Sequence, residues 1–265
     1  MGVMMAEESR GLRLERIGAV LKIVLNRPPA NAFEVPMAQA LRSALQSASE
    51  DSTVRCVWLT GDGRFFSAGQ DVSSIGHPPP AMVQQALHEI YNPCVLLLRT
   101  MPKPVLAAVN GPAAGMGLGL ALAADQRLAA RSARFVFGFT GIGLTADCGV
   151  SALLPAWVGP SQAMRMAFQE EPLTAEQAEA CGLVASVCED SALEKQAGAW
   201  AERLANGPTL ALALTKHAFN RSVFPDLERR MEEEALRQAT AVDTADAQEG
   251  VRAFVEKRRP AFRGA

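Results

Sequence analysis

The sequence is poor in the side chains that most often bind metal ions. Its 265 residues include three histidines, at positions 77, 88 and 217, which lie far apart in the chain. Its five cysteines form no CxxC pair and have no histidine at a metal-ligand spacing. We therefore expect no metal site, and the odd number of cysteines fits a reducing compartment.

The sequence also lacks a charge imbalance, a signal peptide and an uninterrupted membrane span. Its 26 basic and 28 acidic residues give a formal net charge of −2, which argues against a surface for nucleic acid. The N-terminus carries Glu7 and Glu8 and has no basic start before an apolar core. Residues 105–124 are apolar enough to resemble a membrane span, but Asn110, Pro112 and several glycines interrupt them. We expect a cytoplasmic protein with neither nucleic-acid nor membrane partners.

Strand patterns and helix patterns alternate along the chain until about residue 190. Short apolar or alternating runs predict strands at residues 12–16, 20–25, 54–60, 105–109, 126–130, 134–137 and 183–187. Apolar residues at helical spacing predict helices between them, and only helices are expected after residue 208. This order predicts an α/β core with a helical appendage rather than two independent domains.

Local signals mark the course of three helices. Pro93 predicts a kink in the helix that precedes the fourth strand. Thr174 and Gln177 have the spacing of a capping box, and so do Ser191 and Glu194. Each pair therefore predicts the start of a helix.

The strand at residues 105–109 leads into a turn and a small-residue helix. Three glycines at alternate positions, from Gly115 to Gly119, follow the break at Asn110. Glycine lets a backbone pass close to another group, and the first N–H groups of a helix have no intrahelical acceptor. With the positive end of the helix dipole, these donors suit an oxygen that carries or develops negative charge. The stretch therefore predicts an element that presents free N–H groups to a cleft.

Segments that occur in order along the chain resemble the crotonase superfamily, which has the enoyl-CoA hydratase/isomerase fold. They are FSAGQD at 66–71, VNGPAAGMG at 109–117, GLTADCG at 143–149 and the C-terminal FVEKRRPAF at 254–262. Each motif is weak alone, but the ordered set covers essentially the whole chain. The resemblance implies an α/β fold with a core of repeated ββα units wound into a spiral, over residues 1–200. A helical region over residues 201–265 would then build homotrimers, often paired into hexamers.

The resemblance also implies substrates that are coenzyme A thioesters, with no further cofactor. In the family, two backbone N–H groups grip the thioester oxygen, and their positions are Gln70 and Met116 here. A thioester carbonyl becomes an enolate when a proton leaves its α-carbon, so each fixed donor stabilises the transition state by roughly 3 kcal/mol. The alternative is that both residues are simply part of a loop and a helix start.

Coenzyme A is expected to lie near the same two loops. The contacts that the resemblance implies are Ala68, Gly69, Gln70, Asp71, Val72, Gly115 and Lys257. Asp71 also fits a role in shaping its loop, and Lys257 equally fits a solvated helix end. The loop 72–80 and the helix 82–101 are expected to line the acyl pocket.

The acid/base residues depart from the pattern of the hydratases in this superfamily. Those enzymes carry a glutamate three residues after the second N–H donor and another glutamate twenty residues later. This chain has Gly119 and Phe139 at the two positions. Hydration needs carboxylates that deprotonate a water and deliver a proton, so ordinary hydration is not expected.

Asp147 is the remaining candidate acid. Its position matches the aspartate that serves as acid/base in double-bond isomerases of the superfamily and in the ring-epoxide isomerase type of phenylacetate breakdown. If apolar neighbours such as Phe137 and Leu144 wall the site, desolvation raises the pKa of Asp147 toward a working range. The alternative is a loop aspartate that bonds its own backbone.

We therefore expect an acyl-CoA isomerase that moves a C=C bond or rearranges a ring adduct, with Asp147 as the proton shuttle. Two alternatives remain open: another crotonase reaction such as hydration or hydrolysis, and an inactive acyl-CoA-binding member of the family. Asp125 is expected to be structural, and Cys148 lacks a histidine that would activate it as a nucleophile. A Rossmann fingerprint fails because Leu120 stands where a third glycine is needed.

Overall fold

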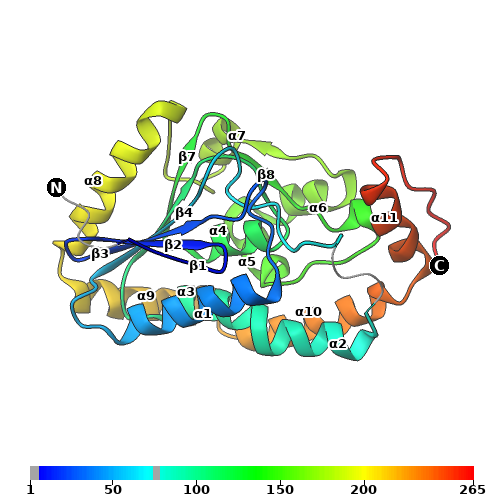
Figure 1. The fold of residues 1–265 in the computed structure, drawn as a ribbon, viewed down its shortest axis with the longest axis horizontal. Helices are drawn as coiled ribbons and strands as arrows, with labels where there is room; N and C mark the ends of the chain where they lie inside the picture. The colour runs from blue at the N-terminus through cyan, green and yellow to red at the C-terminus, as the bar shows by residue number, and fades with distance from the viewer. Residues whose placement is uncertain (1–5, 74–77) are drawn as a thin grey trace.

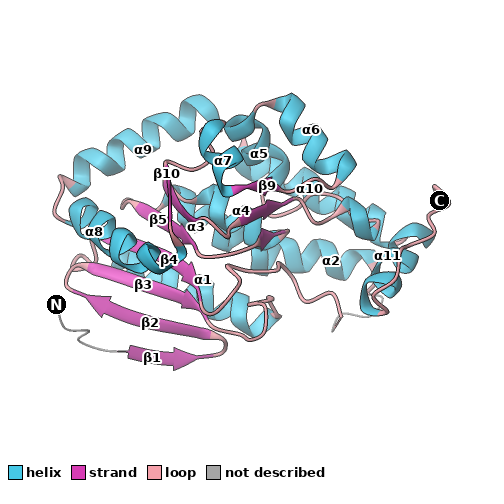
Figure 2. Cartoon of the chain, turned by 90° about the horizontal axis from the view of Figure 1, so that it is seen from above, coloured by secondary structure: helices cyan, strands magenta, loops and turns pink. Residues whose placement is uncertain are grey.

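A seven-stranded sheet lies at the centre of the molecule (Figures 1 and 2). The computed structural model describes residues 6–73 and 78–265. The first three strands are antiparallel and the remaining strands are parallel. In spatial order they are β1 (Ala6–Ser9), β2 (Leu12–Ile17), β3 (Val20–Leu25), β4 (Cys56–Gly61), β5 (Val105–Val109), β7 (Gln126–Ala130) and β10 (Ser186–Cys188).

Helices cover both faces of this sheet (Figure 1). Side chains alternate between the faces of a strand, and β4 shows the result. Its Leu59 joins the larger apolar cluster, with α1 (Val35–Glu50), α3 (Asn92–Thr100) and α4 (Met116–Ala123). Its Trp58 belongs to a second cluster, with buried alanines of α8 (Leu193–Ala205). The α/β class predicted from the alternating patterns is confirmed.

A second, three-stranded sheet begins beside the loop 66–71, in the segment just before α4. It consists of β6 (Ala113–Ala114), β8 (Arg134–Val136) and β9 (Leu173–Thr174). A bridge from Ser67 to Ala113 ties the loop 66–71 to this sheet, and another from Phe33 to Gln70 ties the same loop to the segment before α1. Strands of two residues have too little alternation to be predicted from sequence, so β6 and β9 were not expected.

The remaining helices cover the other surfaces of the molecule. They are α2 (Pro80–Ala86), α5 (Val150–Val158), α6 (Pro160–Gln169), α7 (Ala175–Ala180), α9 (Thr209–Val223), α10 (Leu227–Val242) and α11 (Ala245–Val255), with short 3-10 turns η2 (Thr140–Ile142) and η3 (Asp190–Ala192). The division expected at residue 200 falls inside α8. The helices after it pack on the core: α10 lies against α2 and α5, and α11 lies against η2. Among the described residues, no helix combines the length and apolar character needed to cross a bilayer.

One of the two predicted capping boxes is present. The Thr174 side chain accepts a hydrogen bond from the backbone of Gln177 and the Gln177 side chain returns one. The box expected at Ser191 is wrong, because the chain enters α8 through the 3-10 turn η3 and the N-cap is Ala192. The side chain of Glu194 instead pairs with Lys22 at 2.6 Å.

The strand expected at 183–187 begins later in the structure. The backbone N–H groups of Leu183 and Val184 both donate to the carbonyl of Ala178, at the end of α7. This turn buries both side chains before pairing begins at Ser186. The apolar run that suggested a strand is therefore partly a helix-terminating turn.

The helix in which Pro93 predicted a kink is irregular just before the proline. Between α2 and α3 the chain forms one π-helical turn, η1 (Leu87–Tyr91). Proline has no N–H group for the carbonyl four residues earlier, which belongs to Glu89. The Arg42 side chain donates to that carbonyl at 2.8 Å, so the carbonyl keeps a partner.

Candidate active site

Two backbone segments from distant parts of the chain lie side by side at the start of the second sheet. Ala114 N–H donates to the Ser67 carbonyl at 2.9 Å, and the N–H groups of Phe66 and Ser67 donate to Pro112 at 3.1 and 3.2 Å. A Cβ on Gly69 would lie 2.8 Å from the Ala114 carbonyl oxygen. The loop 66–71 and the segment before α4 are therefore held at backbone contact.

The two predicted oxyanion donors, Gln70 and Met116, follow directly after this contact. Each is preceded by a glycine in the left-handed region, with φ +90° at Gly69 and φ +53° at Gly115. Met116 is the first residue of α4, so its N–H has no intrahelical acceptor. Within residues 6–73 and 78–265, neither N–H has a hydrogen-bond acceptor. The structure thus brings two available donors onto neighbouring backbones, and such a pair can donate hydrogen bonds to a single oxygen.

Asp147 lies in the loop between η2 and α5 and is 5% exposed. Its Oδ2 accepts a hydrogen bond from Gln238 Nε2 at 2.9 Å. Burial raises the pKa of Asp147 to about 6, while the hydrogen bonds from Gln238 and the Cys148 thiol act in the opposite direction. A carboxyl group with this pKa can both accept and return a proton near neutral pH.

Within the described residues, the titratable groups that interact with Asp147 are all acids. They are Tyr91 of η1, the adjacent Cys148 and Glu234 of α10. Burial raises the pKa of Tyr91 to about 12 and that of the Cys148 thiol well above its usual value. Cys148 is therefore a neutral thiol beside Asp147, which agrees with the expectation that it is not a nucleophile.

Two side chains of α10 hold the Asp147 loop, and sequence reasoning missed both. Glu234 accepts hydrogen bonds from the N–H groups of Gly149 and Ser151, each at 2.7 Å. Gln238, one turn later, contacts Asp147 and accepts from the N–H of Thr145 at 3.0 Å. Both side chains are about 4% exposed. The available signal was their position, because both fall on the buried stripe of α10 where an apolar residue is expected.

The positions that would hold the hydratase glutamates are closed. A Cβ on Gly119 would lie 2.7 Å from the Cys148 carbonyl oxygen and 3.2 Å from the Cys148 Cβ. The Asp147 loop therefore occupies the space that a side chain at Gly119 would need. Phe139 is buried and its ring packs edge-on against Phe137, with 5.1 Å between ring centroids. No carboxylate stands at either position.

An apolar cavity of about 200 Å³ adjoins these groups. Its polar side chains are Gln70, Tyr91 and Gln238, and the other lining residues are Val35, Val72, Pro78, Met82, Val83, Ala86, Leu87, Leu144, Val242 and Val251. From the loop 72–80 and the helix 82–101, which were predicted to line the acyl pocket, residues between Val72 and Tyr91 line this cavity. The C-terminal helices α10 and α11 complete the wall. Asp147 lies one hydrogen bond from the cavity, behind Gln238.

The other predicted contact residues divide into two groups. Ala68, Gly69, Gly115 and Val72 lie in the loops around the donor pair. Asp71 accepts hydrogen bonds from the backbone and hydroxyl of Ser73 and pairs with Arg27 at 3.0 Å, so it does shape its loop. These contacts hold the pKa of Asp71 below its usual value.

Lys257 belongs to the C-terminal part of the chain. It follows the end of α11, is exposed and has φ +56°.

Asp125 has the structural role expected for it. Its carboxylate accepts from the Val105 N–H at 2.8 Å, pairs with Lys216 at 2.9 Å and lies 3.5 Å from Arg99. The partly buried carboxylate therefore joins α9, α3 and the start of β5. Asp125 follows the C-cap of α4, the helix that begins at Met116.

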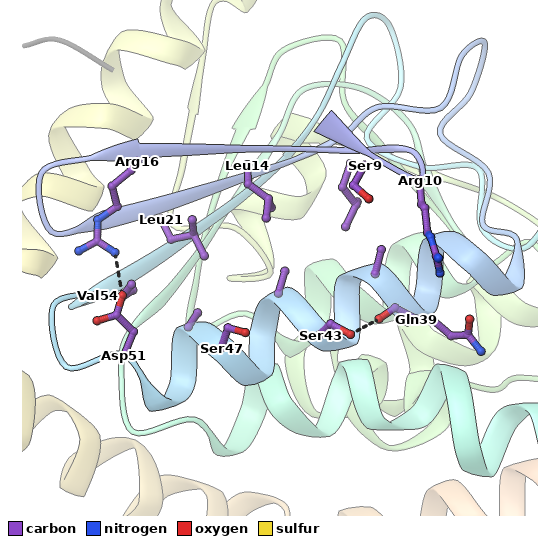
Figure 3. Close-up of a pocket in the computed structure, with 14 residues that line it drawn as sticks. Ser9, Arg10, Leu14, Arg16, Leu21, Gln39, Ser43, Ser47, Asp51 and Val54 are labelled. Atoms are coloured by element: carbon purple, nitrogen blue, oxygen red, sulfur yellow. Dashed lines mark hydrogen bonds and ion pairs between the residues drawn. The ribbon is translucent and has the colours of Figure 1, made fainter. Parts of the chain in front are cut away.

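A larger hollow of about 570 Å³ lies elsewhere, between the β2–β3 hairpin and α1 (Figure 3). Its charged side chains are Arg10, Arg16 and Asp51, and the last two pair with each other at 3.5 Å. The apolar part of its lining consists of leucines of the β2–β3 hairpin, and small residues of α1 lie opposite them. It contains neither the donor pair nor Asp147, and so it is separate from the site described above.

Comparisons with known proteins match nearly the whole chain. The sequence model of the enoyl-CoA hydratase/isomerase family matches residues 15–265. The 1,2-epoxyphenylacetyl-CoA isomerase of Escherichia coli K12 is 42% identical over 249 residues, which are 92% of this chain and 95% of that protein. A probable enoyl-CoA hydratase of Rhodobacter capsulatus is 41% identical over 254 residues, 96% of this chain and 98% of that protein. The crystal structure of an enoyl-CoA hydratase from Mycobacterium avium subsp. paratuberculosis has a TM-score of 0.88 at 35% identity and covers 97% of this chain and 100% of its own.

Proposed function

Because the chain belongs to the enoyl-CoA hydratase/isomerase family, whose crotonase fold it has, we propose that it is an acyl-CoA isomerase. An isomerase and a probable hydratase are similar to it at 42% and 41% identity, so the degree of similarity does not select the reaction. The residues of the site favour isomerisation. One observation carries the proposal: Asp147 is a buried carboxyl group beside the cavity, while Gly119 and Phe139 supply no acid.

In the proposed reaction, the thioester oxygen lies between the N–H groups of Gln70 and Met116. Asp147 removes a proton from a carbon next to the carbonyl or conjugated with it, and the electron pair moves onto the thioester oxygen as an enolate. The two donors stabilise that developing charge. The protonated Asp147 returns the proton to a different carbon, which shifts the C=C bond and consumes no water. Rearrangement of a ring adduct uses the same proton transfer.

The apolar cavity supports an acyl group without charge. Its side chains are almost all aliphatic, and Gln70, Tyr91 and Gln238 are the polar groups in its lining. The loop that contains Ala68, Gly69 and Val72 is proposed to hold the coenzyme A part of the substrate, beside the donors. Lys257 would contact a phosphate only if coenzyme A extends beyond this loop, as between two subunits.

Exposed apolar side chains support the proposal of a homotrimer or a pair of trimers. Several of them lie on three helices, among them Met164 and Phe168 on α6, Leu210, Leu214 and Phe219 on α9, and Phe254 and Val255 on α11. Single exposed apolar residues are common, but contiguous apolar areas usually mark contacts with another protein. Light scattering of the purified protein tests this proposal, and a monomer would contradict it. All five cysteines are free, which supports a cytoplasmic location.

The proposed function is tested with Asp147→Asn. We expect turnover of a 3-enoyl-CoA to its conjugated 2-enoyl isomer to fall by at least ~10³-fold, because Asn cannot accept the proton. Binding of acyl-CoA, measured by calorimetry, should remain within a few-fold. Asp243→Asn, which changes an exposed acid at the end of α10, is the matched control.

Two further measurements separate the alternatives. Hydration of crotonyl-CoA, followed by loss of the enone absorbance, would favour a hydratase over the isomerase. Exchange of substrate protons for deuterium in D₂O reports the first proton transfer even for a poor substrate. An Asp147→Asn protein that isomerises at the wild-type rate would overturn the assignment, and a wild-type protein that binds acyl-CoA without exchange would favour an inactive binder.

A further inference from the structure

The amide of Gln238 has one possible orientation. The backbone N–H of Thr145 points at it from 3.0 Å and can only donate, so the side-chain oxygen Oε1 must face Thr145. The amide nitrogen Nε2 is then directed at Asp147 Oδ2, at 2.9 Å. This assignment follows from the hydrogen-bond partners and does not depend on distinguishing nitrogen from oxygen by position alone. Gln238 is therefore a fixed donor to the carboxylate.

The surroundings of this hydrogen bond make it unusually important for the charge on Asp147. The side chains of Gln238 and Asp147 are 4% and 5% exposed, so water screens the contact little. The titratable groups that face Asp147 are Tyr91 from η1, Cys148 from the same loop and Glu234 from α10, with Cys94 of α3 behind Cys148. Each of these groups is neutral when protonated and negative when ionised, so none of them supplies a positive charge. The neutral amide of Gln238 thus stabilises the carboxylate at a place where many proteins have a lysine or an arginine.

We propose that Gln238 is a positioning residue, which fixes the plane of the Asp147 carboxylate and stabilises its ionised, proton-accepting form. The inference rests on the proposed function, because it assigns a purpose to Gln238 only if Asp147 accepts a proton. Gln238 also lines the cavity, so it fixes the carboxylate from the side that the acyl group approaches. Glu234, one turn earlier on α10, holds the same loop through its backbone. The two side chains therefore have different tasks: Glu234 holds the loop, and Gln238 sets the state of the acid.

Gln238→Met separates these tasks. Methionine keeps the length and approximate volume of the side chain and removes both amide groups. The variant loses a buried hydrogen bond to the Asp147 carboxylate, and this loss should raise the pKa of Asp147. The acidic limb of kcat/KM should therefore move up by about one pH unit. At pH 6 we expect kcat to fall about fivefold, because the ionised fraction of Asp147 drops from about one half to about one tenth, with less loss at pH 8 and little change in KM.

Gln238→Glu provides a second, conservative variant in case the methionine protein folds poorly. It retains an acceptor for Thr145 and places a second carboxyl group against Asp147. Two carboxylates this close cannot both ionise easily, so the acidic limb should move up at least as far. Gln248→Met, on the exposed face of α11, is the matched control and should leave the profile unchanged.

Glu234→Gln distinguishes positioning from simple loosening of the loop. Like the Gln238 variants, Glu234→Gln weakens contacts to the Asp147 loop. Unlike them, it removes a negative charge near Asp147, so the acidic limb of kcat/KM should not move to higher pH. An acidic limb that stays at the wild-type pH in both Gln238 variants, while Asp147→Asn is inactive, would overturn the role of Gln238 and leave the proposed function intact. Full activity of Asp147→Asn would instead overturn the proposed function itself.

Discussion

The backbone of Gly69 lies directly against the backbone nitrogen of Met116, and a Cβ added to Gly69 would lie 3.3 Å from that nitrogen. The same Cβ would be 2.8 Å from the Ala114 carbonyl oxygen, closer than real Cβ contacts. The spacing of the two N–H donors therefore depends on the absence of a side chain at this one residue. Any group there pushes the two loops apart and separates the donors.

Gly69→Ala should accordingly disable the site without touching Asp147. Alanine disfavours φ +90° and its methyl group meets the neighbouring backbone. Displacement of one donor should lower kcat/KM by about 10²–10³-fold. The control is Gly63→Ala, which has a similar φ of +67° but open space around the new methyl group. Equal losses in the two variants would mean that backbone strain, rather than donor spacing, explains the effect.

The pKa of Asp147 sets the pH dependence of the reaction. The first proton transfer needs an ionised carboxylate, and burial raises the pKa of this group to about 6. Activity should therefore rise with pH between about pH 5 and pH 7 and level off above. A profile of kcat/KM against pH shows this rise as its acidic limb, provided that no group of the substrate titrates in the same pH range. An acidic limb near pH 4 would mean that an exposed carboxylate is the base.

The same group makes the folded protein less stable at neutral pH. Its pKa is about 6 when folded and near 3.8 when exposed, so the folded state binds a proton that the unfolded chain has lost between these values. Stability must fall as the pH rises through this window, by up to about 3 kcal/mol. Asp147→Asn should remove this dependence and unfold at higher urea concentration than wild type at pH 7.5, with a smaller difference at pH 4. A variant less stable than wild type at both pH values would contradict this expectation.

Restoring a glutamate at position 119 should not create a hydratase. A Cβ there would lie 2.7 Å from the Cys148 carbonyl oxygen, which belongs to the Asp147 loop. Gly119→Glu should cost several kcal/mol of stability, since it buries a charge in an occupied space. It should also displace Asp147 and abolish isomerisation, with no gain in hydration of crotonyl-CoA. Gly198→Ala, in the middle of α8 with its nearest neighbour at 3.8 Å, is the control and should be neutral or slightly stabilising.

The cavity wall should set the size of the acyl group. Ala86 is a small residue in the lining, at the end of α2. Ala86→Trp adds a large ring to a cavity of about 200 Å³, so bulky acyl groups should lose binding while short ones are retained. The measurement is KM for a series of enoyl-CoA chain lengths, and the acidic limb should stay where it is. A uniform loss across all chain lengths would place Ala86 outside the acyl pocket.

The main elements of the fold were predictable because their patterns are long. The buried strand β5 and the amphipathic helix α1 have enough residues for a clear period. The short strands β6 and β9 were missed because two residues carry no period. The capping box expected at Ser191 failed for a different reason: a 3-10 turn supplied the same helix start without a side-chain cap.

The candidate site was predictable to the extent that it consists of motifs. Gln70, Met116 and Asp147 lie in segments that resemble the family, and the first two are brought together by contacts that no local pattern contains. Gln238 and Glu234 lie in no motif and act at a distance of 91 and 85 residues from their partners. Their only sequence signal is a polar residue on the buried stripe of α10, which indicates that something must satisfy it but not what.

The contact between Gln238 and Asp147 also has a consequence for the order of events during synthesis. The ribosome produces Asp147 and both N–H donors long before it produces α10, because Gln238 follows Asp147 by 91 residues. A partly made chain can close the central sheet, and domains commonly begin to fold while synthesis continues. Its acid nevertheless sits in a loop that still lacks the hydrogen bonds to Glu234 and Gln238. The protein therefore gains its aligned base as one of the last steps of its own production, so nascent chains on the ribosome should be catalytically silent.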